Sequence, residues 1–139
     1  MSLDQSLSVA TNALCVIAFL APAPVPATKI AEQIDVNPVV IRRAVGKLVS
    51  AGLVTSIAGA HGGYVLARST QEITLQDVFG AMSEKGIFER ANASPRATCP
   101  EGEVISDAIT AVFSQAETAF AQVLKHTTID ALLKQTEFA

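Results

Sequence analysis

The strongest constraint on the fold lies in residues 28–68, where the sequence pattern predicts two short helices followed by a β-hairpin. Thr28 can cap the first helix, which lasts about two turns before the pattern breaks. Asn37 and Pro38 open the second helix, because asparagine accepts a hydrogen bond at the cap and proline loses none at the first helical position. Gly52 ends it, since glycine readily takes the left-handed conformation that closes a helix. The segment therefore begins as a helix-turn-helix.

The β-hairpin follows directly. Residues 53–57 are rich in β-branched side chains, and a glycine-rich turn at 58–63 separates them from a second short segment at 64–68, a pattern that predicts two antiparallel strands. A hairpin directly after two helices is typical of a winged helix-turn-helix. Thr74 and Asp77 then occupy the cap and third positions of a further helix. The predicted fold class is mainly α with a small β-hairpin, a winged helix-turn-helix extended by a long C-terminal dimerisation helix.

The long C-terminal helix is predicted for residues 103–125, where the apolar residues fall on two lines. One small domain can hardly cover both lines, so we expect this helix to be buried on more than one side and to meet the same helix of a partner subunit. Sedimentation of a monomer alone at micromolar concentration would contradict this homodimer. The first line follows positions 105, 109, 112, 116, 120 and 123, and the second contains Val104, Ala108, Phe113 and Leu124.

These patterns divide the chain into three regions. Residues 1–83 form the winged-helix unit, whose first helix extends from about Leu7 to a proline-rich turn. Residues 84–102 lose the periodic pattern and are predicted to be a loop. Residues 103–139 hold the dimerisation helix and a short last helix capped by Thr128. A length of 139 residues, half of them apolar, fits a compact unit with a large core.

The charge is distributed unevenly along the chain. The whole sequence carries a formal net charge of −3, which does not favour a nucleic-acid binder. Residues 28–68, however, carry +3, whereas residues 69–139 carry −5. A basic segment that coincides with a predicted helix-turn-helix indicates an interaction with DNA.

The candidate DNA contacts lie at the start of the first helix of the motif, on the outward side of the second helix, and in the hairpin turn. On the helix, arginines can pair with a guanine edge and valines can pack on a thymine methyl group. In the turn, small residues let the backbone approach a phosphate or enter a minor groove, and His61 can donate to phosphate. A solvated basic face and an ordinary tight turn are the alternative interpretations. The predicted contacts are Thr28, Asn37, Val39, Val40, Arg42, Arg43, Lys47, His61, Gly62 and Gly63.

Four motifs, at residues 37–48, 51–54, 62–68 and 73–78, together cover much of the chain, and the Gly-Gly-Tyr that precedes Ile-Thr-Leu is fairly specific. They resemble the Rrf2 (BadM-type) family of winged-helix regulators, which includes iron–sulfur, nitric-oxide and cysteine-metabolism regulators. The resemblance implies a homodimer on a palindromic operator, with contacts exchanged through the long C-terminal helices. The matching positions in the recognition helix are Asn37, Val39, Val40, Arg42 and Arg43.

Two positions depart from the family pattern. Ala58 stands where several relatives have an arginine that reaches into the minor groove, so that contact is not expected here. Cys99 is the one cysteine in the region where cluster-binding members have three closely spaced cysteines. One thiolate per subunit cannot replace the usual ligands of an iron–sulfur cluster, so we expect no cofactor. A brown purified protein with visible absorption would contradict this expectation.

The two cysteines also bear on compartment and regulation. They are 84 residues apart, which fits neither a disulfide framework nor a zinc spacing and favours a reducing compartment. Cys99 lies near a predicted helix start, where a thiol can have a lowered pKa and act as a redox or electrophile sensor; an inert loop thiol is the alternative. An oxidant response of operator binding that survives Cys99→Ser would exclude the sensor. Cys15, in an apolar run, is expected to be a small buried side chain.

Other function classes are not favoured. The sequence offers no Ser/His/Asp or Cys/His set, phosphate-binding glycine loop or zinc-helix motif, so an enzyme is not expected. The apolar run at residues 13–20 is too short to span a bilayer and follows no basic leader, which predicts a cytoplasmic protein without membrane contact.

The predicted function is therefore a dimeric transcriptional regulator, with repression favoured. It would bind double-stranded DNA at a palindromic operator through residues 37–50 and the wing at 59–63, and respond to an unidentified small-molecule or redox effector. The alternative is a winged-helix module for protein assembly, which the acidic net charge permits.

Overall fold

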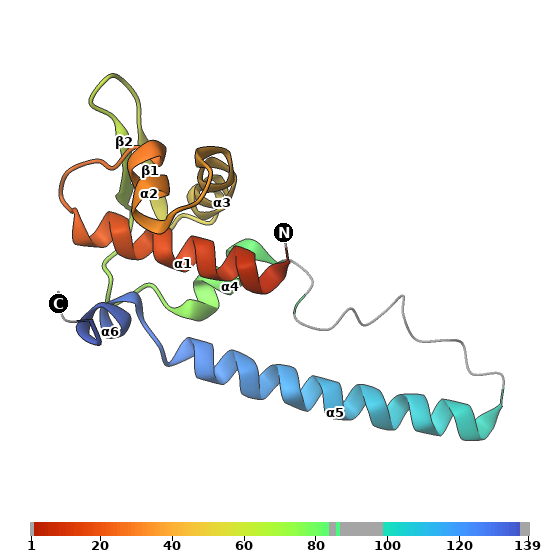
Figure 1. Ribbon diagram of the computed structural model, residues 1–139. Coiled ribbons are helices and arrows are strands. Elements are labelled where there is room, and N and C mark those ends of the chain that lie inside the picture. The colour runs from red at the N-terminus through yellow and green to blue at the C-terminus, as the bar shows by residue number, and fades with distance from the viewer. Residues whose placement is uncertain (1, 84–85, 87–98, 137–139) are drawn as a thin grey trace.

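The computed structural model describes residues 2–83, 86 and 99–136. Helices dominate this part of the chain, and its one sheet is an antiparallel hairpin of two strands (Figure 1). The predicted fold class is thereby confirmed. The elements in chain order are α1 (Leu3–Phe19), α2 (Ala27–Ile34), α3 (Pro38–Ser50), β1 (Val54–Ile57), β2 (Gly63–Leu66), α4 (Leu75–Met82), α5 (Pro100–Lys125) and α6 (Ile129–Lys134).

Helix α1 occupies the centre of the fold. It contacts α2, α3, α4, α6 and β2, and in Figure 1 it runs between α2 and the hairpin above it and α4 and α6 below it. The core forms because each of these elements turns an apolar side toward α1. The largest fully buried side chains include Leu14, Ile17, Ile30, Ile41, Leu48, Leu53, Ile73 and Ile129.

The predicted start of α3 is confirmed. Asn37 Oδ1 accepts a hydrogen bond from the backbone N–H of Val39 at 2.9 Å, and Pro38 is the first helical residue. Gly52 follows the helix with a φ of +77°, the left-handed conformation that the sequence predicts. Thr128 likewise caps α6 through its hydroxyl. Local sequence signals therefore place these helix ends.

The predicted cap at Thr28 is wrong. Helix α2 begins at Ala27 with Pro26 as its N-cap, so Thr28 lies exposed in the first turn. The reason is a non-local contact: Val25 N donates to Tyr64 O at 3.0 Å, and Tyr64 N donates to Val25 O at 2.9 Å. This bridge holds the chain extended as far as Pro26, and the helix starts directly after it.

Helix α1 also begins earlier than predicted, at Leu3 rather than near Leu7. The side chain of Gln5 accepts a hydrogen bond from the backbone N–H of Ser2 at 3.2 Å, which satisfies a donor at the helix start. The first turn carries few apolar residues, so the apolar periodicity does not reveal it.

Helix α5 begins at Pro100, with Cys99 as its N-cap. Proline in the first position and acidic side chains in the first turn both suit a helix start, so residues 100–102 belong to the helix and not to the predicted loop at 84–102. Apart from Gly86 and Cys99, the rest of that predicted loop lies outside the described residues.

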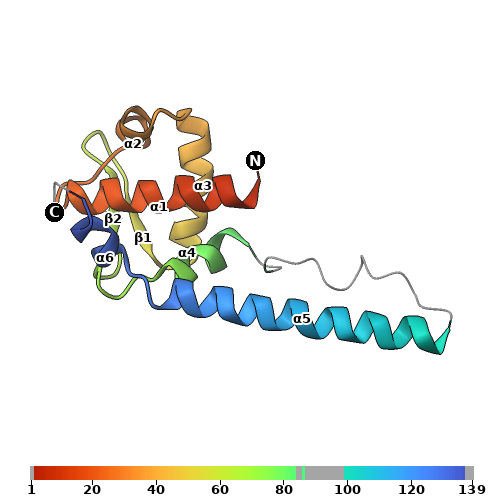
Figure 2. The same cartoon turned by 60° about the horizontal axis from the view of Figure 1, so that its bottom comes forward.

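The C-terminal part of α5 packs on α4, where the rings of Phe79 and Phe120 meet edge to face with centroids 5.3 Å apart. Leu124 is buried nearby. The rest of α5 projects away from the core (Figure 2). Neither α5 nor any other helix in the described part of the chain is long and apolar enough to cross a membrane. Both predicted apolar lines of α5 contain side chains that are exposed in the single chain. The exposed fraction is 46 to 68% for Val104, Ile105, Ile109, Val112, Phe113 and Val123.

Helix α6 returns to the winged-helix core. The backbone N–H of Leu75 donates to Thr127 O, and that of Ile129 donates to Ile73 O, both at 2.9 Å. Ile129 is fully buried. The end of the predicted 103–139 region therefore shares the core of the winged-helix unit, because its apolar side packs on α1.

Thr74→Ala should lower the free energy of unfolding by about 1 kcal/mol. The predicted capping box is confirmed: Thr74 Oγ1 accepts from the Asp77 N–H at 3.1 Å, and the Asp77 carboxylate accepts from the Thr74 N–H at 3.0 Å. Alanine leaves the Asp77 N–H without this acceptor. Urea unfolding measures the change, and Thr74→Ser, which keeps the hydroxyl, is the control. Equal losses in the two variants would show that the methyl group matters and the cap does not.

Candidate nucleic-acid interface

Helix α3 has a buried apolar side and an exposed basic side, as its periodicity predicts. The core side is filled by four small or branched residues, Ile41, Ala44, Val45 and Leu48. Val39, near the helix start, is a large apolar side chain, but it is 56% exposed and does not belong to the core. The exposed side consists of Val39, Arg42, Arg43, Gly46 and Lys47, with Val40 half-buried at its margin.

The wing consists of β1, β2 and the turn at 58–62, and it begins four residues after the end of α3. Gly59 has a φ of +105°, which glycine adopts without strain. A Cβ on Gly62 would lie 2.0 Å from the carbonyl oxygen of Ile57. Position 62 is therefore restricted to glycine, and the neighbouring His61 is exposed in the turn.

Gly63 holds the wing close to the start of α2. A Cβ at this position would lie 2.5 Å from the carbonyl carbon of Val25 and 2.7 Å from the nitrogen of Pro26. Its φ of +149° is also unfavourable for other residues. Together with the Val25–Tyr64 bridge, this close approach fixes the wing relative to the helix-turn-helix.

An open hollow of about 280 Å³ lies between the wing, the start of α2 and α3. It brings together four predicted contacts from three segments that are distant in sequence, namely Thr28, Arg42 and the adjacent Gly62 and Gly63. The remaining predicted contacts do not line this hollow but follow the exposed side of α3 and the wing turn: Asn37, Val39, Val40, Arg43, Lys47 and His61.

Ser56 and Tyr64 also line the hollow, and the sequence prediction missed both. They are directly paired across the hairpin, so their side chains lie on the same face of the sheet. The alternation of side chains along the two predicted strands was the signal that could have identified them.

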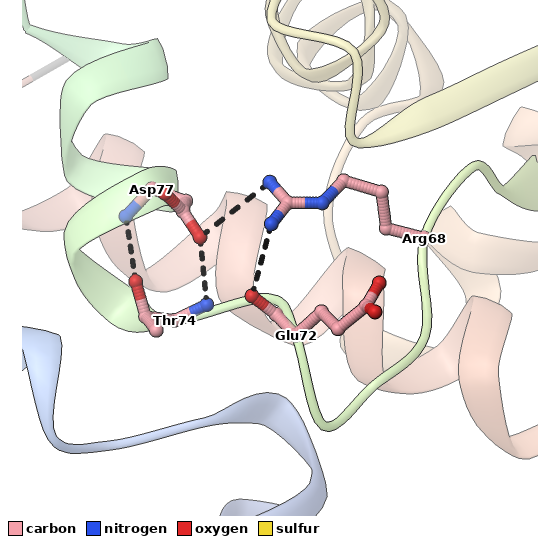
Figure 3. A network of polar contacts seen from close by, with 4 residues as sticks. All are labelled: Arg68, Glu72, Thr74 and Asp77. Carbon is pink, nitrogen blue, oxygen red and sulfur yellow. Dashed lines mark hydrogen bonds and ion pairs between the residues drawn. The ribbon is translucent and has the colours of Figure 1, made fainter.

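Arg68 connects the end of the wing to α4 (Figure 3). Its Nη2 donates to the carbonyl oxygen of Glu72 at 3.3 Å, and its Nη1 lies 3.8 Å from Asp77 Oδ2. The pair is partly exposed and contributes under about 1 kcal/mol. Because Asp77 faces this guanidinium, the basic charge of the candidate interface comes from α3, with Arg42, Arg43 and Lys47, and not from Arg68.

The two cysteines differ in environment. Cys99 is exposed, and its Sγ accepts a hydrogen bond from the backbone N–H of Gly102 at 3.4 Å. Cys15 is half-buried in α1, and burial raises the pKa of its thiol. Cys15 therefore forms less thiolate at neutral pH than an ordinary cysteine.

The order of these elements and the basic α3 beside a wing match known regulators. The model of the Rrf2 family, described as an iron-dependent transcriptional regulator, matches residues 3–135. The chain belongs to the Rrf2 family. The Bacillus subtilis protein YwnA, which is named as an HTH-type transcriptional regulator, is 30% identical over 95 residues, or 68% of this chain and 71% of YwnA.

Solved structures of Rrf2 regulators share the fold. CymR, the global cysteine regulator of B. subtilis, is similar with a TM-score of 0.74 and 24% identity, covering 99% of each chain. IscR of T. potens gives a TM-score of 0.74 at 22% identity, covering 99% of this chain and 89% of IscR. The identification as a winged-helix Rrf2 transcriptional regulator is thus confirmed by both sequence and fold.

The family description mentions iron, but the donor groups in the described part of this Rrf2 member are not arranged as a metal site. The described residues hold no group of three or more His, Cys, Asp or Glu side chains placed to bind a metal ion. The sequence has two cysteines, of which Cys15 is half-buried in α1 and Cys99 lies at the start of α5. One exposed thiol does not supply the ligands of an iron–sulfur cluster, so no role is assigned to iron.

Proposed function

We propose that this Rrf2 regulator is a homodimer that binds a palindromic operator and represses transcription from it. Helix α3 enters the major groove, and the wing contacts the adjacent minor groove. The observation that carries the proposal is the exposed row of Val39, Arg42, Arg43 and Lys47 on α3. Arginine pairs with guanine edges, and valine packs on thymine methyl groups.

The dimer is supported by the exposed apolar side of α5. Six large apolar side chains of this helix are 46 to 68% exposed in the single chain, and an apolar surface of this extent is typical of a protein interface. A two-fold axis relating two such helices presents two copies of α3, which is what a palindromic operator requires.

The test begins with genomic DNA fragments recovered on the purified protein. Fluorescence anisotropy then compares one recovered duplex with a scrambled duplex of the same composition. We expect selective binding whose Kd rises steeply between about 50 and 200 mM salt, because phosphate contacts release counterions. Absent or equally weak binding to both duplexes would favour the alternative, a winged-helix module for protein assembly.

The direction of regulation has its own test. Transcription in vitro from the recovered promoter should fall as the protein is added, whereas a rise would make the protein an activator. The redox role of Cys99 stays a prediction; its exposed position at the N-cap of α5 is compatible with it. Operator binding by wild type and Cys99→Ser after oxidant treatment separates a sensor from an inert thiol.

A further inference from the structure

We propose that the hollow between the wing, the start of α2 and α3 seats a phosphodiester group of the DNA strand that separates the two grooves. This inference deepens the DNA-binding function proposed above and rests on it. A helix in the major groove and a wing in the adjacent minor groove stand on either side of one sugar-phosphate strand. The hollow lies between these two elements, so the strand that separates them passes over it.

The lining of the hollow has the chemistry of a phosphate site. Among its lining residues, Arg42 has a guanidinium group, and Thr28 and Tyr64 have hydroxyl groups. Arginine and hydroxyl side chains are common donors to DNA phosphates. None of the ten lining residues carries a carboxylate, so the charge of the hollow is complementary to an anion.

The shape of the hollow also suits a backbone that passes closely. Half of its ten lining residues are glycine or alanine, and short side chains let a sugar-phosphate strand approach the protein backbone. The contacts described for Gly62 and Gly63 exclude larger residues at two of these positions. At these two positions the wing therefore has no side chain that would keep a sugar-phosphate strand away from its backbone.

This placement assigns different DNA contacts to Arg42 and Arg43, the two arginines on α3. Arg42 lines the hollow, so it contacts the backbone and fixes the position of the protein on DNA whatever the sequence. Arg43 does not line it, and from the exposed side of α3 it contacts base edges. Phosphate contacts set affinity, whereas base contacts set specificity, so variants of the two residues should behave differently.

The experiment uses anisotropy on the recovered duplex and on its scrambled counterpart. Arg42→Gln should weaken binding to both by about tenfold and reduce the slope of log Kd against log salt by about 1 per protomer. The ratio of the two affinities should stay unchanged. Arg42→Lys keeps the charge and should keep the slope, whereas Arg43→Gln should reduce the ratio. Lys125→Gln, in the last turn of α5, is the charge-matched control and should alter neither.

The hydroxyl groups are tested separately. Tyr64→Phe and Thr28→Val each remove one donor, and each should weaken binding to both duplexes by about threefold. Circular dichroism checks that every variant is folded at the assay temperature.

Three results would overturn the proposal: unchanged binding by Arg42→Gln, unchanged binding by both hydroxyl variants, or a reduced affinity ratio in Arg42→Gln at an unchanged salt slope. The last result would make Arg42 a base-reading residue. Failure of the wild-type protein to bind either duplex would instead reject the proposed function itself, before any variant is compared.

Discussion

Replacing Ile109 with glutamate should convert the homodimer into monomers and weaken operator binding by at least about a hundredfold, because a single α3 then binds one half-site. Ile109 lies in the apolar line of α5 and is 49% exposed in the single chain. In the dimer its replacement would place an unpaired carboxylate in an apolar interface, which is strongly unfavourable. Sedimentation velocity at micromolar concentration measures the assembly, and anisotropy on the palindromic duplex measures the affinity.

Thr118→Glu is the matched control for this prediction. Thr118 is exposed on the same helix and lies nine residues beyond Ile109, which places it about 180° around the helix axis. The added charge should leave both the dimer and its affinity intact. A wild-type protein that sediments as a monomer, or an Ile109→Glu variant that remains a dimer, would show that α5 is not the interface.

Gly63→Ala should lower the free energy of unfolding by about 3 kcal/mol. The new Cβ would overlap the backbone of Val25 and Pro26, so β2 must move away from the start of α2. Its φ of +149° adds strain for any residue with a side chain. Urea unfolding followed by circular dichroism gives the difference in stability.

Gly80→Ala provides the opposite expectation in the same assay. Gly80 is exposed in α4, and a Cβ there meets nothing within 4 Å, so alanine should stabilise the helix by about 1 kcal/mol. A Gly63→Ala variant as stable as wild type would mean that the close approach of the wing can relax without cost.

Local signals were sufficient for much of the fold. Asn37-Pro38 and Gly52 specify the ends of α3 through groups within a few residues, and Thr74 with Asp77 specifies the start of α4. The start of α2 was mispredicted because it depends on a bridge to Tyr64, which is 39 residues away from Val25. No cap residue reveals such a contact.

The candidate interface was predictable to a similar degree. The 3.6-residue repeat separates Arg42, Arg43 and Lys47 from the core side of α3, and the exposure of these residues agrees with it. The hollow was not predictable from periodicity, because its walls come from three elements that meet only in the folded chain. Ser56 and Tyr64 enter it through the pairing of β1 with β2.

Because α5 is anchored at its C-terminal end, a small change in its tilt there moves its N-terminal end by a larger distance. Phe120 and Leu124 pack at that end, and the hydrogen bonds of Thr127 and Ile129 clamp the chain that follows. With 26 residues α5 is about 39 Å long. A change of about 5° in its tilt at the anchored C-terminal end therefore displaces its N-terminal end by about 3 Å. In the proposed dimer, the angle at which two such helices cross would therefore set the distance between the two copies of α3, and with it the length of operator that the dimer can span.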